Sequence, residues 1–138
     1  MEAQKHPITI SAVVDVVGAL ATGSLSGNVY LVDTNRENGS TGLGTEELRT
    51  AVRKGDELLW TVLPLECEAY VAIDDIVMDK SICAPARKVY PGTDVAYWVG
   101  TVKKEAGAAT PYDIKFKLGT RIDPMTTATA SYLVGQAG

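Results

Sequence analysis

The stretch that decides the fold runs from Asn28 to Leu65, NVYLVDTNRENGSTGLGTEELRTAVRKGDELLWTVLPL. It contains a short apolar run at residues 29–32, a loop rich in glycine and asparagine at residues 33–44, and two alternating segments on either side of Lys54-Gly55-Asp56. Apolar and polar residues that alternate with a period of two indicate strands with one buried face. Glycine in the triplet tolerates a positive φ, so a turn is expected there. The stretch therefore predicts antiparallel β-structure.

Similar alternation occurs along the rest of the chain, where each apolar segment is bounded by turn-forming residues. The cleanest case is Tyr112 to Leu118, in which Asp113, Lys115 and Lys117 separate the apolar residues and predict a strand with one solvated face. Further strands are expected at residues 8–16, 69–78, 95–102 and 128–134.

The segments between these strands are expected to be turns and loops. Residues 18–27 are rich in Gly, Ser and Thr and predict a turn or an irregular edge. Residues 46–53 are expected to form a strand, with a helix over residues 45–52 as the alternative because glutamate and leucine favour helices. Pro64 is expected to end its strand, since proline has no amide proton to give to a ladder.

Size and composition favour one soluble globular domain. The chain has 138 residues, of which 46% are hydrophobic and 22% charged, values typical of such domains. With no amphipathic helix expected, the pattern predicts an all-β fold, an immunoglobulin-like, two-sheet antiparallel β-sandwich of about eight strands. A single domain over residues 1–138 is expected.

Charge and terminal sequence restrict the partners and the compartment. There are 17 acidic against 13 basic residues and no basic stripe, so nucleic acid is not an expected partner. No apolar run reaches the roughly 18 residues that a membrane span needs. The first residues, MEAQKHPITIS, lack the features of a signal peptide, which predicts a cytoplasmic protein. In that reducing compartment, Cys67 and Cys83 are expected to be unpaired thiols.

The residues required by common catalytic mechanisms are missing from the sequence. His6 is the only histidine, whereas a Ser-His-Asp or Cys-His mechanism needs an imidazole held against its nucleophile. Gly39, Gly42 and Gly44 are not followed by the Lys-Ser/Thr of a phosphate-binding loop. The chain is therefore not expected to be an enzyme and needs no cofactor.

A polar loop provides the first candidate ligand residues. Asp33, Asn35, Glu37 and Asn38 place oxygen atoms in a glycine-rich segment, a composition that could hold calcium. The spacing differs from an EF-hand loop, because the turn glycine falls one position late and Gly44 stands where the bidentate glutamate should be. A solvated loop whose Asn and Asp residues make turns is the preferred interpretation, with calcium as the alternative.

An adjacent aromatic pair provides the other candidates. Tyr97 and Trp98 lie in an expected strand, where successive side chains point to opposite faces. One ring should therefore face the core and the other the surface, where it could bind a ligand or a partner. The possible ligand or partner contacts are thus Asp33, Asn35, Asn38, Tyr97 and Trp98.

Several segments occur in an order that resembles the AidA/PixA inclusion-body proteins of bacteria. VYLVDTN at residues 29–35 is followed by NGSTGLGTEEL at 38–48 and GDELLWTVLPLE at 55–66. Later matches are AYWVGTV at residues 96–102, the segment from Gly107 to Leu118 with its Tyr and Phe, and the Ile-Asp-Pro that ends at Pro124.

The resemblance implies a bacterial β-sandwich protein that is made under population-density or growth-phase control and, in some members, is stored as cytoplasmic inclusions. It implies no enzymatic activity. The leading hypothesis is a non-enzymatic, self-associating or binding protein, a homo-oligomer that uses exposed strand edges and aromatic patches. The alternative is a small carbohydrate-binding module that uses the loop at residues 33–44 and an outward Tyr97 or Trp98, with or without calcium. A hydrolase is a third hypothesis.

Overall fold

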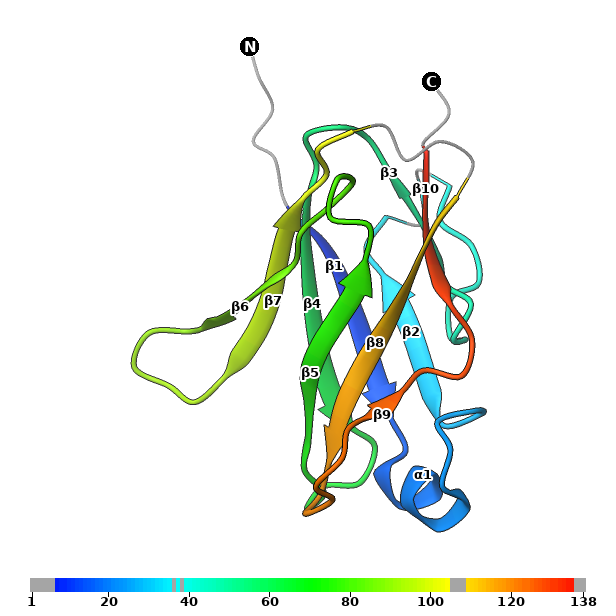
Figure 1. Ribbon diagram of the computed structural model, residues 1–138, viewed down its shortest axis with the longest axis vertical. Helices are drawn as coiled ribbons and strands as arrows, with labels where there is room; N and C mark the ends of the chain where they lie inside the picture. Colours follow the sequence, from blue (N-terminus) through cyan, green and yellow to red (C-terminus); the bar gives the residue numbers. More distant parts are fainter. Residues whose placement is uncertain (1–6, 36, 38, 105–108, 136–138) are drawn as a thin grey trace.

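The computed structural model describes residues 7–35, 37, 39–104 and 109–135, which form two five-stranded sheets and one short helix (Figure 1). Sheet A has the order β2-β1-β4-β7-β6 and consists of β1 (Ile8–Val14), β2 (Val29–Asp33), β4 (Glu57–Pro64), β6 (Ala86–Val89) and β7 (Ala96–Thr101). Sheet B has the order β3-β10-β8-β5, with β9 paired to β8, and consists of β3 (Arg49–Val52), β5 (Val71–Met78), β8 (Thr110–Leu118), β9 (Met125–Thr126) and β10 (Ser131–Gly135). The protein is mostly β, as the alternating segments predicted.

The number of strands and their directions differ from the prediction. The described part of the chain contains ten strands rather than about eight, because β6 and the two-residue β9 were not predicted. Both sheets are mixed rather than antiparallel, since β1 runs parallel to β4 and β3 runs parallel to β10. Alternation has the same period in parallel and antiparallel strands, so it could not reveal these directions.

The buried side chains of both sheets form one core. Trp60 on β4 and Tyr112 on β8 meet edge to face, with ring centroids 5.9 Å apart, and the Trp60 indole donates a hydrogen bond of 3.5 Å to the Tyr112 hydroxyl. Burial raises the pKa of Tyr112 well above its usual value, so this hydroxyl stays protonated. The Trp98 indole of β7 also donates to the backbone oxygen of Ile73 on β5, at 3.3 Å. Polar atoms on the large aromatic residues therefore link the two sheets inside the core.

A helix, α1 (Val16–Thr22), occupies residues that were predicted to end the first strand and begin a turn. Its first turn is capped twice: Asp15 accepts from the Gly18 amide, and the distant Glu66 carboxylate accepts from the amides of Val16 and Val17. The helix ends at Gly23, whose φ of 71° is the left-handed conformation that favours glycine. The seven residues of α1 are too few to be stable alone, so these caps explain a helix that the sequence did not predict.

The expected strand at residues 46–53 is shorter in the structure, and no helix forms over residues 45–52. β3 begins only at Arg49, because the preceding residues turn so that Glu46 can accept a hydrogen bond of 2.7 Å from the Ser131 hydroxyl through its backbone oxygen. The other predicted strands agree with β2, β4, β5, β7, β8 and β10 to within a few residues, and β4 ends at Pro64 as expected.

Candidate functional site

The outer face of sheet A is the most unusual surface of the molecule. On β1, β2, β4 and β7 the residues that alternate with the core residues point outward, and the register aligns them across the sheet. Most of these outward residues are apolar. We call this set the apolar face, and it consists of Val13, Tyr30, Val32, Leu59, Leu63, Tyr97 and Val99.

The outer face of sheet B shows what an ordinary solvated face of this protein looks like. Its strands carry charged side chains at the matching outward positions, among them Arg49, Asp75, Asp113, Lys115 and Lys117. Asp75 and Lys115 lie opposite each other in the register of β5 and β8, and the Arg49 guanidinium lies 4.4 Å from the centroid of the Tyr132 ring. The amino-acid composition of the chain therefore does not explain the apolar face, because the same chain places charged residues on the outer face of sheet B.

Three apolar side chains on the face are strongly exposed, and the other four are partly buried. Leu63 is 62% exposed, Tyr30 42% and Val32 41%. Next to the face, the hairpin that joins β6 to β7 adds Tyr90 at 59% and Val95 at 63%. Single exposed apolar residues are normal, but a contiguous group of this kind marks a contact surface.

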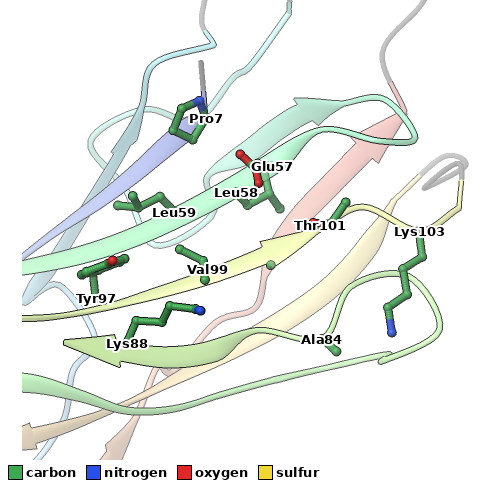
Figure 2. A pocket seen from close by; sticks show the side chains of 11 residues that line it. Pro7, Glu57, Leu58, Leu59, Ala84, Lys88, Tyr97, Val99, Thr101 and Lys103 are labelled. Carbon is green, nitrogen blue, oxygen red and sulfur yellow. The ribbon is translucent and has the colours of Figure 1, made fainter. Parts of the chain in front are cut away.

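Two adjoining hollows lie on the face and share Leu59 and Tyr97. The first has a volume of about 600 Å³ and is lined by residues of β4, β6 and β7 (Figure 2). The second has a volume of about 570 Å³ and extends along Leu63 toward Tyr90 on the hairpin. Tyr97 thus stands between two recesses large enough for side chains of a partner or for a small ligand.

The polar groups on the face are few and lie in defined places. Ser11 and Thr61, side by side on β1 and β4, are hydrogen-bonded to each other through their hydroxyls at 3.1 Å. Glu57 on β4 and Lys88 on β6 lie on either side of β7 and point to the first hollow (Figure 2). No charged side chain other than these two stands at an outward position of the paired strands in the described part of sheet A.

Asp33 and Asn35 lie inside the fold rather than in a solvated loop, with each residue only 8% exposed. One Asp33 carboxylate oxygen accepts a hydrogen bond of 2.8 Å from the backbone amide of Asn35. The side-chain amide of Asn35 in turn donates to the backbone oxygen of Ala51. These bonds make a turn and attach it to the edge of β3, which is a structural role. The other Asp33 oxygen, Oδ2, is buried and has no hydrogen-bond partner among the residues that the structure describes.

The remaining predicted contacts are placed differently from one another. Asn38 lies outside the residues that the structure describes. Trp98 is 8% exposed and its ring belongs to the core, whereas Tyr97 faces outward and lines both hollows. The aromatic pair is therefore split between core and surface, as strand geometry predicted.

Metal-binding and nucleophilic groups do not gather at the face. Within residues 7–35, 37, 39–104 and 109–135, no three His, Cys, Asp or Glu side chains are grouped so that they could hold a metal ion. Cys83 is buried under β7, and burial raises its pKa to about 11, so its thiol is protonated near neutral pH. Cys67 is exposed in the loop after β4.

Sequence reasoning identified Tyr97 but missed most of the apolar face. The signal was present in the strands that are apolar at successive positions, such as Leu58-Leu59 and Val62-Leu63. Such runs indicate that both faces of a strand are apolar, whereas the alternation in β8 indicates one wet face.

The fold and the site define a small, mostly β protein with an apolar outer face on one of its sheets. The chain belongs to a family described as a domain of unknown function (DUF8788), whose model matches residues 6–123. No curated protein matches the chain in a sequence search. No helix among the described residues is long and apolar enough to cross a bilayer.

A solved structure with a similar fold is an inclusion body protein (PixA) from Burkholderia cenocepacia J2315. The two superpose with a TM-score of 0.69 over 100% of this chain and 98% of that one, at 14% sequence identity. This likeness supports, at the level of the fold, the resemblance to the AidA/PixA proteins that the sequence suggested.

Proposed function

We propose that this protein is a non-enzymatic, self-associating or binding protein whose contact surface is the apolar face of sheet A. The observation that carries the proposal is the contrast between the two outer faces, one apolar and one charged. We further propose that the chain forms a single domain, an immunoglobulin-like β-sandwich, and acts in the cytoplasm. The inclusion body protein with a similar fold is consistent with a role in assembly.

The energetic argument for a partner comes from the exposed side chains. Fully burying a Leu, Val or Phe side chain stabilises a protein by about 1.5–3 kcal/mol relative to leaving it in water. Leu63 and Val32 are each roughly half exposed, so covering both could contribute about 2 kcal/mol, before the costs of association are subtracted. The face as a whole could therefore support binding of moderate strength.

Strand edges, which the sequence also suggested as contact surfaces, are protected. The edge of β5 has a bulge between Ile73 and Asp75 and exposes Asp74 and Asp75. The edge of β6 carries Arg87 and Lys88. Bulges and charges of this kind are the usual means of preventing edge-to-edge pairing.

On the opposite flank, bridges from the loop before β3 cover the edges of β2 and β3. Leu31 of β2 forms a bridge with Thr45, and Arg49 of β3 forms one with Thr41. Because all four edges are charged, bulged or covered, the face is a better contact surface than any edge.

The test compares two outward apolar-to-glutamate substitutions, one on each sheet. Leu63→Glu places a charge on the apolar face, and Val77→Glu places one at a 46% exposed valine on the outer face of sheet B. Light scattering at increasing protein concentration should show association of the wild type and of Val77→Glu, and its loss in Leu63→Glu. Equal effects of the two substitutions would contradict a role specific to the apolar face.

Carbohydrate binding is the second candidate function, and the position of Tyr97 favours it. Its ring lies between two hollows, beside the polar side chains of Lys88 and Thr61. A sugar ring could stack on such an aromatic surface while hydroxyls bind the polar groups. A glycan array, run with and without chelator, would test this proposal. Tyr97→Ala, with the buried Trp98 kept in place, should lose the binding that the wild type shows.

A further inference from the structure

We infer that the occupant of the apolar face is a second copy of this chain, docked face to face about a two-fold axis that passes close to Val99. The inference rests on the proposed function and adds the identity of the partner and the geometry of the contact. Three properties of the face carry it: its size, the state of its polar groups and the placement of its two charges.

The size of the face suits a homodimer of moderate affinity. Five strands about 4.8 Å apart span about 20 Å, and the eight residues of β4, each rising about 3.3 Å, span about 25 Å, so the face measures about 20 Å by 25 Å. The exposed Tyr90 and Val95 extend this surface along the hairpin. Stable interfaces bury about 800 Å² per partner and weak ones less than about 600 Å², so a face of this size is large enough for a reversible dimer, for which we expect association in the micromolar range.

The polar groups at the centre of the face can be buried at little cost. Burying a hydroxyl without a hydrogen bond is unfavourable. Here the Ser11 and Thr61 hydroxyls already bond to each other, at 3.1 Å. The backbone amide of Thr9 is likewise satisfied by the Thr34 hydroxyl, at 3.0 Å. A flat apolar sheet from a partner can therefore cover this region without leaving these groups unpaired.

The two charged residues at outward strand positions make the face complementary to itself. A third charged residue at the rim of the first hollow, Lys103, lies beyond β7 and donates from its ammonium to the Lys80 backbone oxygen, at 3.3 Å. Lys88 lies level with Tyr97, and Glu57 lies level with Thr101, on the strands that flank β7. Val99 is the outward residue midway between them (Figure 2). A two-fold axis that lies in the interface and runs midway between Glu57 and Lys88 passes over Val99. It brings each lysine opposite the glutamate of the other copy.

Two-fold symmetry requires every contact to occur twice, with the roles exchanged. One acidic and one basic residue on opposite sides of the axis satisfy this requirement, whereas two residues of the same sign would repel their copies. The face therefore fits a second copy of itself, and a partner with a different charge pattern would gain no such double match.

Charge reversal tests the pairing by sedimentation equilibrium of the full chain. Lys88→Glu and Glu57→Lys should each weaken dimerisation about tenfold, because each places two like-charged pairs in the interface. The double variant, Glu57→Lys with Lys88→Glu, should restore the affinity of the wild type. Failure of the double variant to recover, with each single variant weakened, would overturn the two-fold geometry.

Cross-linking tests the position of the axis independently. In a Cys67→Ser background, Val99→Cys should form a covalent dimer with a short bismaleimide, because a residue on the axis meets its own copy. Lys117→Cys, an exposed position on the outer face of sheet B, is the matched control and should not cross-link. Equal cross-linking at both positions would also overturn the inference.

The outcome for the wild type separates this inference from the proposed function. A wild type that stays monomeric at about 100 μM rules out the second copy as the occupant, since micromolar association is expected. If that monomer binds a glycan and Leu63→Glu abolishes the binding, the apolar face is still a binding surface and the proposed function stands. If Leu63→Glu changes neither association nor glycan binding, both fail.

Discussion

Gly100 of β7 lies against the buried Cys83, and this contact gives the sharpest prediction of stability. A Cβ atom added at Gly100 would lie 2.6 Å from the Cys83 sulfur, well inside van der Waals contact, and 3.4 Å from backbone atoms of Pro85. Cys83 is fully buried, with 0% exposure, so the sulfur cannot move into solvent. Gly100→Ala should therefore force β7 or the chain at Cys83 to shift.

The size of this effect follows from overpacking. Extra methyl groups in a well-packed core cost about 1–3 kcal/mol, so we expect Gly100→Ala to lower the free energy of unfolding by about 2 kcal/mol. For a chain of this length, that loss corresponds to a fall in Tm of roughly 5–10 °C. Urea titration and differential scanning calorimetry would measure both quantities.

The matched control removes the other partner of the contact. Cys83→Ala alone should cost about 1 kcal/mol or more through the small cavity it leaves, but it also removes the atom against which the new methyl group would clash. The double variant should therefore be more stable than the sum of the single effects predicts. Full stability of Gly100→Ala, or additive effects in the double variant, would refute this description of the contact.

Three further predictions concern individual side chains. At pH 8 one thiol, Cys67, should react with a maleimide in the native protein, and Cys83 should react only after unfolding, because burial raises its pKa to about 11; two rapidly reacting thiols would contradict this. Burial also raises the pKa of the Glu46 carboxyl above its usual value, and the hydrogen bond from Thr129 opposes this shift only in part. The folded state therefore binds the proton more tightly than the unfolded state, so the stability that this group contributes is lost as the pH rises. Glu46→Gln should consequently gain stability relative to the wild type between about pH 4 and pH 7 in urea titrations, and a constant difference would count against it. Trp98→Phe should lose about 1 kcal/mol in the same assay through the hydrogen bond of the indole to β5, while a change within error would show that this bond contributes nothing.

The strands that were predicted well are those whose local pattern decides their structure. β8 alternates without interruption from Tyr112 to Leu118, and its burial follows the same alternation. β4 ends at Pro64 because a proline cannot donate to the ladder. In these segments, the burial of one strand face or the chemistry of a single residue is enough to predict the strand and its end.

Features that depend on distant residues could not be predicted. α1 is capped by Glu66, fifty positions from Val16 in the sequence, and its remaining signals were a single Asp and a Gly. β1 pairs in parallel with β4, although β2 and β3 come between them along the chain and β3 belongs to the other sheet. Asp33 and Asn35 resembled ligands in a loop, and only the fold shows that they anchor β3.

The candidate site was predicted only at Tyr97. Because Tyr97 and Trp98 are neighbours in a strand, one ring had to face outward, but the sequence did not show which ring this is or on which sheet it lies. The apolar face is assembled from β1, β2, β4 and β7, so it exists only once the register of sheet A is known. Leu59, Leu63 and Val99 look like core residues in the sequence, and the structure places them on the surface.

Paramagnetic broadening of methyl signals by a soluble gadolinium chelate tests most directly whether the apolar face is covered in solution. Leu63 is 62% exposed in the single chain and Val77, on the outer face of sheet B, is 46% exposed. If a partner copy covers the face, the Leu63 methyl groups should be broadened less than those of Val77 at high protein concentration, and the order should reverse on dilution. Broadening that is stronger at Leu63 at every concentration would contradict the account.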